Sequence, residues 1–187
     1  MSRTRYIAQA GIIAAVYAAL TLLVVQVGGV FSWGPIQFRP SEAVTVLAAF
    51  TPAAIPGLWL GAVIANAFSV TQVGAIGLLD VVFGSLGSLL GAVWTWRFRK
   101  RVALALAGPV IANALIVPAY LPFMLKALGG LDMYRFLGVD AGGAWIAMYL
   151  FGVVTVGVGE ALVVYVPGLL LLLALRSLKL PALTEHN

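Results

Sequence analysis

The sequence predicts an all-α integral membrane protein, and its composition, hydropathy and segment lengths support this fold class. The chain has 187 residues, of which 63% are hydrophobic and 9% charged, and its mean hydropathy is +1.08. A soluble domain carries about 25% charged residues, so this composition cannot cover an aqueous surface. Apolar runs of the length needed to cross a bilayer recur along the chain. We therefore expect one membrane domain over residues 1–187.

Six helices are expected from the apolar runs and the residues that interrupt them. They cover residues 6–27, 40–50, 52–68, 73–96, 102–125 and 142–175. Gly28 and Gly29 end the first helix, and Pro40 suits the first turn of the second. This second helix is only about 15 Å long, which is too short to cross alone.

The later helices are marked by prolines and glycines. Thr51-Pro52 forms the start of the third helix, in which Pro56 is expected to cause a bend. Three prolines are expected to kink the helix 102–125: Pro109, Pro118 and Pro122. The last helix is too long for one straight crossing, so it projects from the bilayer or breaks at Pro167-Gly168. Segments 28–40 and 126–140 are expected loops.

The basic residues predict the topology. With six crossings, one side carries Arg3, Arg5, Arg97, Arg99, Lys100, Arg101, Arg176 and Lys179. The other side carries Arg39, Lys126 and Arg135. Because positive residues concentrate on the cytoplasmic side, this difference places both termini in the cytoplasm.

Six polar residues within or beside the expected spans are candidate binding residues. They are Arg39, Glu42, Asn66, Asp80, Asn113 and Glu160. A charge at membrane depth costs roughly 3 kcal/mol on insertion scales and usually serves a function. The set contains three acids and one base, so internal pairing alone does not neutralise the acids. A cavity that binds a polar or cationic molecule would neutralise them.

Structural explanations compete with binding at each position. Glu42 suits a helix N-terminus, the asparagines can join helices by hydrogen bonds, and Arg39 can act as a topological anchor. Asp80 and Glu160 can form a purely structural pair. Phe31 and Trp33 fit an interfacial aromatic belt or a stacking surface for a flat ligand.

Several chemistries are excluded, so we expect binding without catalysis, cofactor or metal. There is no cysteine and no Walker A sequence, and His186 in the tail is the only histidine. Asp80 is the only aspartate within a span, whereas an aspartyl protease needs two. The clustered basic residues suit membrane topology better than nucleic acid.

Several stretches together resemble the QueT family of substrate-binding S components of energy-coupling factor (ECF) transporters. They are Ile36–Leu47, which contains Arg39-Pro40-Ser41-Glu42, Thr51–Leu58, Ile64–Asn66, Gly77–Gly84, Pro109–Ala114 and Gly157–Glu160. The likeness covers nearly the whole chain in order. Pro40 departs from the family pattern and should stiffen the start of its helix.

The resemblance implies a multi-pass protein of a prokaryotic cell membrane, with six helices and both termini inside. It implies capture of a queuosine precursor or queuine, a 7-deazaguanine base, from outside. It also implies a membrane scaffold subunit and two ATPase subunits as partners. Small residues on the first helix would dock on the scaffold, and Ala10, Ala14 and Ala18 form such a stripe.

Other functions remain open from the sequence. One is an S component for another vitamin, such as a flavin or a pterin. A membrane enzyme or a stand-alone channel would belong to a different functional class. The sequence lacks the nucleophile and base that an enzyme would need. A channel would need a continuous polar stripe through the bundle.

Overall fold

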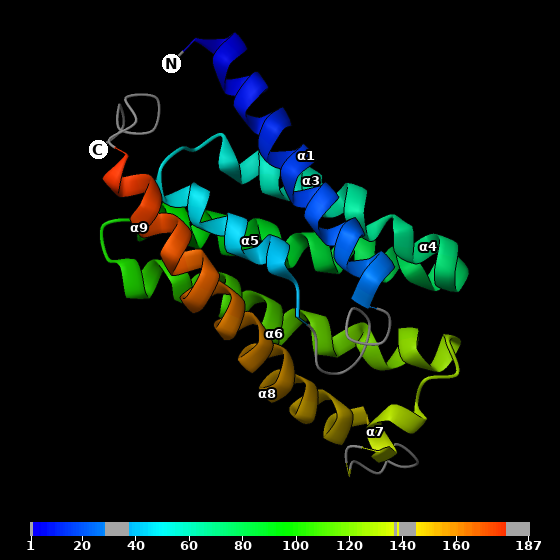
Figure 1. Ribbon diagram of the computed structural model, residues 1–187. Helices are drawn as coiled ribbons and strands as arrows, with labels where there is room; N and C mark the ends of the chain where they lie inside the picture. Colours follow the sequence, from blue (N-terminus) through cyan, green and yellow to red (C-terminus); the bar gives the residue numbers. More distant parts are fainter. Residues whose placement is uncertain (1, 29–37, 137, 139–144, 179–187) are drawn as a thin grey trace.

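The protein is helical throughout the part of the chain that the computed structural model describes, residues 2–28, 38–136, 138 and 145–178 (Figure 1). The first elements are α1 (Arg3–Gly28), η1 (Pro40–Ala49), α3 (Ala54–Asn66), α4 (Phe68–Val73), η2 (Gly74–Gly77) and η3 (Asp80–Gly84). The others are α5 (Ser85–Arg97), α6 (Val102–Ala127), α7 (Asp132–Phe136), α8 (Trp145–Val163), η4 (Val164–Gly168) and α9 (Leu169–Ser177). The predicted all-α class is confirmed for these residues.

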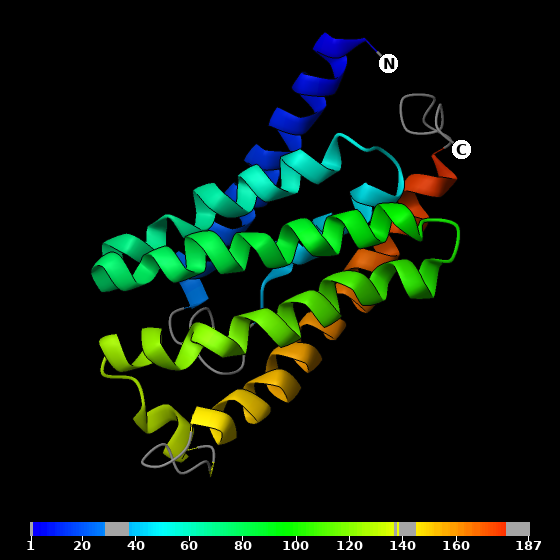
Figure 2. The same cartoon turned by 180° about the vertical axis from the view of Figure 1, so that it is seen from behind.

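Four helical stretches in the described ranges are long and apolar enough to cross a membrane. They are Arg3–Val27, Ala54–Gly77, Val102–Ala127 and Trp145–Ser177. The start of α1, the end of α9 and the α5–α6 turn lie toward one end of the molecule, away from α7 (Figures 1 and 2). The six crossings and the orientation of the termini stay predictions.

The segment η1 lies in the centre of the bundle, between α1, α3, α5 and the region of η4 and α9 (Figure 1). It is a 3₁₀-helix, and eight of its ten residues are buried. The helix expected over residues 40–50 is therefore present, but as a 3₁₀-helix instead of an α-helix. A 3₁₀-helix rises about 2.0 Å per residue, so the segment spans about 20 Å and is still too short to cross alone.

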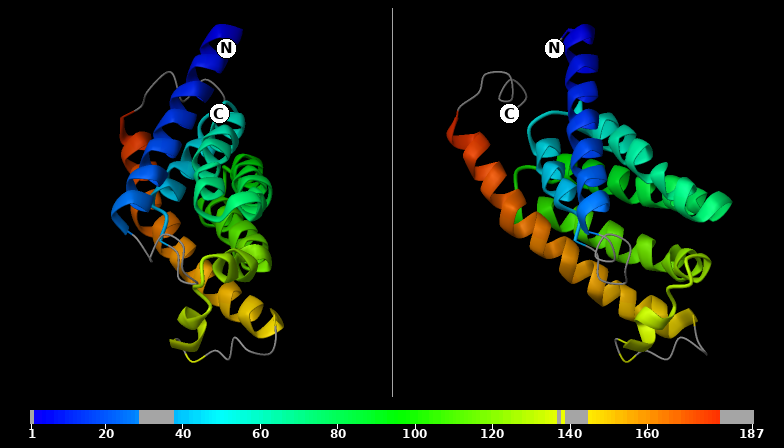
Figure 3. Two further views of the ribbon diagram at one scale, coloured as in Figure 1. Left: turned by 90° about the vertical axis from the view of Figure 1, so that its right-hand side faces the viewer. Right: turned by 45° about the vertical axis from the view of Figure 1, so that its right-hand side comes forward.

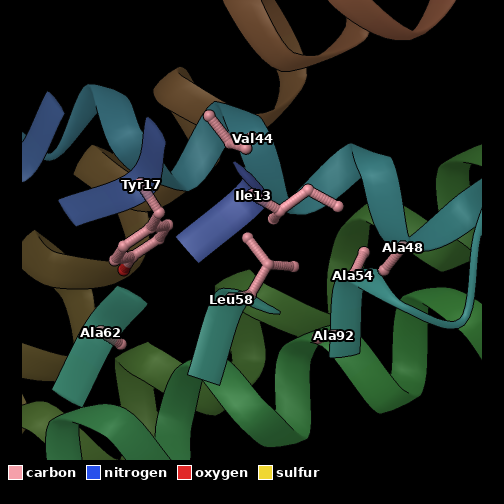
Figure 4. Packing of buried hydrophobic residues seen from close by; sticks show 8 residues of the cluster. All are labelled: Ile13, Tyr17, Val44, Ala48, Ala54, Leu58, Ala62 and Ala92. Atoms are coloured by element: carbon pink, nitrogen blue, oxygen red, sulfur yellow. The ribbon is translucent and has the colours of Figure 1, made fainter. Parts of the chain in front are cut away.

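One face of η1 packs into an apolar cluster with α1, α3 and α5 (Figure 4). Its buried members are Ile13, Tyr17, Val44, Ala48, Ala54, Leu58, Ala62 and Ala92. Glycines bring α1 and α3 together, because a Cβ at Gly57 or Gly61 would lie 2.8 Å from the carbonyl oxygen of Ala10 or Ala14. Small residues at such a crossing allow the two backbones to approach.

The third and fourth expected helices differ from the structure at their shared boundary. The helical path of α3 and α4 continues to Val73, and Gly74 then adopts a φ of 62°. Residues 69–72, between the two expected helices, are therefore helical, and the next α-helical residues come only after Gly77. The turn is tight, since a Cβ at Gly77 would lie 2.5 Å from the carbonyl carbon of Ser69.

The prolines of α3 and α6 do not end these helices. Pro56 lies in the first turn of α3, where no helical hydrogen bond is lost, so the expected bend has no cause there. The predicted helix 102–125 corresponds to α6, which is continuous through its three prolines, and the kinks expected at these prolines stay a prediction. Its end and α7 occupy much of the expected loop 126–140.

The last helix does not break at Pro167. The stretch Trp145–Ser177 stays helical because η4 is a π-turn, whose wider spacing accommodates the missing amide hydrogen bond. Its 33 residues span about 50 Å, more than the hydrocarbon thickness of about 30 Å. Figure 3 shows this helix running obliquely along the bundle. Its expected start at residue 142 lies outside the described residues.

Candidate functional site

The carboxylate of Glu42 occupies the centre of a buried polar group around η1. The side chain is 1% exposed. Its Oε1 accepts a short hydrogen bond from the Tyr17 hydroxyl of α1 and a second one, at 3.4 Å, from Ser88 of α5. Its Oε2 accepts a bond from Thr45 at 3.2 Å. Glu42 therefore connects α1, η1 and α5. A glutamate that only interacted favourably with the N-terminus of its own helix would not need these partners.

The carboxylate of Asp80 occupies a second position, at the start of the π-turn η3. Its Oδ2 accepts a hydrogen bond from Ser69 at 2.6 Å, and its Oδ1 accepts one from Tyr120 of α6 at 2.7 Å. The Arg39 guanidinium lies 3.8 Å from the same Oδ1. Arg39 has 16% of its side chain exposed, so it is part of the polar group rather than an external anchor.

Gly84 makes this arrangement around Asp80 possible. A Cβ at that position would lie 2.6 Å from Asp80 Oδ1, 2.8 Å from the Tyr120 hydroxyl and 2.9 Å from Asn66 Nδ2. Asn66 itself donates to the backbone oxygen of Asp80 at 3.1 Å and to Ser85 Oγ at 3.2 Å. A π-turn is often found at functional sites, and here it carries a buried acid at its first residue.

The third carboxylate, that of Glu160, comes from α8. Asn113 of α6 donates a hydrogen bond from Nδ2 to its Oε1 at 3.1 Å. Glycine again opens the approach, because a Cβ at Gly87 would lie 2.5 Å from Asn113 Oδ1. Gly87 directly precedes Ser88, which donates to Glu42, so this pair lies beside the rest of the polar group.

The structure brings all six polar residues singled out in the sequence into one region, where five are buried and Arg39 is partly buried. We call them the polar core: Arg39, Glu42, Asn66, Asp80, Asn113 and Glu160. With its carboxylates ionised, this set carries three negative charges and one positive charge. Low local dielectric strengthens interactions among such groups and makes an uncompensated charge costly. The excess of acid therefore favours a cation or bound protons in this region.

A small cavity opens beside Arg39 and Asp80. Its volume is about 10 Å³, and its walls include Thr21, Asn66 and Ala65. That volume holds about one water molecule, whereas pockets for organic ligands measure hundreds of Å³. In the described part of the chain, the Tyr134 hydroxyl is the one buried side-chain polar atom without a hydrogen-bond partner. Within the described residues, this cavity is therefore too small for an organic ligand, and the buried side-chain polar atoms of the polar core have hydrogen-bond partners.

Sequence reasoning missed the hydroxyl groups that hold the acids in place. They are Tyr17, Thr45, Ser69, Ser88 and Tyr120. A tyrosine in the middle of an apolar helix is a sequence signal for such a group, because its buried hydroxyl usually needs a hydrogen-bond partner. Phe31 and Trp33, the expected stacking residues, lie outside the described residues.

The alanine stripe on α1 is placed differently from the expected docking surface. Ala14 and Ala18 are 3% and 6% exposed, so both are buried within the chain, and the backbones of Ala10 and Ala14 lie against the glycines of α3. A second stripe lies on the open side of α1 and consists of Gly11, Ala15 and Ala19. A Cβ at Gly11 would meet nothing within 4 Å, and all three residues are exposed, so no described part of the chain covers this side.

The side chains of the polar core offer several hydrogen-bond acceptors and donors. Within the described residues, no group of three His, Cys, Asp or Glu side chains is arranged to hold a metal ion. Carboxylates accept N–H groups in pairs, and an asparagine amide both donates and accepts. Together they suit a small solute rich in N–H groups.

Comparison with known proteins agrees with the resemblance seen in the sequence. The family model described as "QueT transporter" matches residues 7–177. The chain is 41% identical over 91 residues to the "Queuosine precursor transporter QueT" of Lactococcus lactis subsp. cremoris (strain MG1363). This alignment covers 48% of the chain and 53% of the relative, so it spans about half the length of each. No solved structure matches the chain.

The family match extends over almost all of the described helices, including every residue of the polar core. A family of transporters and several long apolar helices together fit a multi-pass protein of a prokaryotic cell membrane. The chain therefore belongs to the QueT transporter family.

Proposed function

We propose that this protein is the substrate-binding S component of an ECF-type importer for a queuosine precursor or a queuine-like 7-deazaguanine base. The family and the printed name of the Lactococcus lactis relative support the class of solute. In this proposal the chain captures the solute from outside, and a scaffold subunit with two ATPase subunits drives its uptake. The protein itself catalyses no reaction.

The observation that carries the proposal is the convergence of three buried carboxylates, two asparagine amides and one arginine around η1. A guanine-like edge offers adjacent N–H donors and a carbonyl acceptor. Glu42 or Glu160 can accept two such N–H groups, and Asn66 or Asn113 can both donate and accept. An aminomethyl substituent is cationic and suits Asp80 through a charge-assisted hydrogen bond. Stacking of the flat ring on Trp33 or Phe31 stays a prediction.

Binding must open the polar core, because a cavity of about 10 Å³ cannot admit a base. The longest polar contact of Asp80 is the 3.8 Å separation from Arg39. A protonated amine can replace the guanidinium there while the Ser69 and Tyr120 hydrogen bonds remain. The solute therefore exchanges an internal ion pair for one of its own, which reduces the desolvation cost of entry.

Calorimetry with 7-aminomethyl-7-deazaguanine tests the role of the acids. We expect Asp80→Asn and Glu160→Gln each to weaken binding tenfold or more, since a hydrogen bond to a charged group contributes roughly 1.5–3 kcal/mol. Asp132→Asn is the matched control, because that carboxylate is 84% exposed on α7. Unchanged affinity in either core variant would remove that residue from the binding site.

Mass spectrometry of small molecules that co-purify with the protein tests the class of solute. A deazaguanine mass is the expected result. A flavin or pterin mass would instead identify an S component for another vitamin. A variant that binds nothing is compared with the unmodified protein by thermal unfolding, which separates loss of binding from loss of the fold.

Docking on the scaffold is assigned to the open side of α1. Gly11, Ala15 and Ala19 are spaced by four residues on that side, and neighbouring Ile12 is 65% exposed. This stripe replaces the buried Ala14 and Ala18 as the proposed contact. We expect Ala15→Trp to prevent co-purification with the scaffold while solute binding persists. Val154→Trp is the control, on an exposed position of α8.

A further inference from the structure

The turn between α5 and α6 carries a dense positive charge that the polar core does not use. Four of its five residues are basic: Arg97, Arg99, Lys100 and Arg101. They line a surface pocket of about 450 Å³ together with Phe98. The α5–α6 pair that ends in this turn faces the viewer in Figure 2.

No carboxylate neutralises this turn within the described residues. Three of the four acids there belong to the polar core, and the fourth, Asp132, pairs with Arg135 in α7. Neither of the two ion pairs formed by described residues involves residues 97–101. A pocket with this charge is complementary to an anion.

The pocket is partly ordered by its aromatic residues. The Arg99 guanidinium lies 4.0 Å from the ring centroid of Trp96 and donates to the Trp96 carbonyl oxygen at 3.0 Å. Arg97 lies 5.7 Å from the Phe98 ring centroid. These contacts hold two cations near the rings, in a position typical of the membrane interface.

The helix that follows adds backbone donors. The first amide groups of α6 have no intrahelical acceptor, and its N-cap residue, Arg101, provides no side-chain cap. An anion at the start of a helix is stabilised by these amides and by the helix dipole. The start of α6 directly follows these basic residues, so its first amide groups add to the positive potential beside the pocket.

An apolar groove leaves the pocket along α5 and α6. Its volume is about 370 Å³, and it shares Arg97 and Phe98 with the basic pocket. Its other walls are Leu90, Val93, Trp94, Gly108, Ile111 and Ala112. The two helices cross closely here, since a Cβ at Gly91 would lie 2.8 Å from the Pro109 Cα.

Trp94 lines the groove beside Arg97 and Phe98, the two residues that the groove shares with the pocket. Its Nε1 donates to the carbonyl oxygen of Leu104 at 2.8 Å, which fixes the indole against α6. Gly108 makes room for it, because a Cβ there would lie 2.4 Å from Trp94 Cδ1. The indole is therefore held in place as one wall of the groove.

We propose that an anionic phospholipid of the surrounding leaflet binds here, with its phosphate in the basic pocket and an acyl chain in the groove. A headgroup pocket continuous with an apolar groove matches the two parts of such a lipid. An unspecific topology signal needs the charge alone and neither the groove nor the ordered aromatic residues. The site is separate from the polar core and does not depend on the solute.

The test measures lipid affinity of the purified full-length protein in detergent by native mass spectrometry. The probes are dioleoylphosphatidylglycerol, dioleoylphosphatidylcholine and the short-chain dihexanoylphosphatidylglycerol. We expect the unmodified protein to prefer the long-chain anionic lipid. The combined variant Arg97→Gln, Lys100→Gln and Arg101→Gln should lose about tenfold or more of this affinity.

Two further variants keep the test decisive. Lys126→Gln with Arg135→Gln removes cations near the other end of α6 and should leave the preference intact. Ile111→Trp keeps every charge but fills the groove, so it should remove the preference for the long chain over the short one. The proposal is overturned if the triple variant binds like the unmodified protein, or if both chain lengths bind the unmodified protein equally.

A protein interface is the competing occupant. If the triple variant loses its scaffold or ATPase partners while its lipid affinity stays unchanged, the turn contacts protein and the lipid proposal fails.

Discussion

Gly84→Ala changes one hydrogen atom into a methyl group at the most crowded point of the polar core. Gly84 has ordinary helical dihedral angles, φ −62° and ψ −44°. Its backbone therefore accepts alanine, and helix propensity alone predicts a gain of about 1 kcal/mol. The new methyl group would nevertheless meet the Asp80 carboxylate at 2.6 Å and the Tyr120 hydroxyl at 2.8 Å.

The loss at this site outweighs the gain. Separating Tyr120 from Asp80 removes a charge-assisted hydrogen bond, which contributes about 2 kcal/mol. Forcing a methyl group into a packed interior costs about 2 kcal/mol more. After the gain in propensity, the expected net loss of stability is about 3 kcal/mol, which corresponds to a Tm lower by roughly 6–12 °C for a chain of this size.

Thermal unfolding of the purified protein in detergent measures this difference. Gly11→Ala is the matched control, because Gly11 also lies within a helix but a Cβ there meets nothing within 4 Å. That variant should be as stable as the unmodified protein or slightly more so. Equal melting temperatures for the two alanine variants would refute the claim that Gly84 makes room for the acid and its partners.

Two other predictions concern stability alone. Gly61→Ala should lower the melting temperature, because its Cβ would lie 2.8 Å from the Ala14 carbonyl oxygen and overpacking costs about 1–3 kcal/mol; an unchanged value would contradict the close α1–α3 crossing. Burial raises the pKa of Tyr134, in α7, to about 12 from 10.0. The unfolded chain then releases this proton first, so stability should fall as the pH rises from 10 to 12. Tyr134→Phe should remove that part of the pH dependence, and identical pH profiles would argue against it.

The sequence predicted the residues of the polar core but not how they are paired. Charged and amide side chains are conspicuous in apolar spans, so Glu42, Asp80 and Glu160 were evident. Their partners were not, because the hydroxyl groups of Tyr17 and Tyr120 reach them from helices far away in sequence. Such pairing depends on how each helix is rotated in the bundle, and local periodicity does not specify that rotation.

The expected start of the fourth helix was misplaced for a local reason. Ser69, Thr71 and Gln72 are polar residues between the two expected helices. In the structure Ser69 is buried and donates to Asp80, so the polar side chain serves the core from within a helix. The true break is at Gly74, whose positive φ requires a residue without a side-chain clash.

The amino-acid sequence alone determined the membrane class, the apolar spans, the excess of acid at membrane depth and the positive charge of the α5–α6 turn. Each of these follows from composition and local pattern. Only the tertiary structure decided that η1 is a buried 3₁₀-helix and that one small-residue stripe of α1 is covered while the other is open. The physical reason is that lipid is as apolar as the protein interior, so hydrophobicity cannot tell the buried side of a helix from its outer side. Close contact between backbones makes that distinction, and it exists only once the helices are packed.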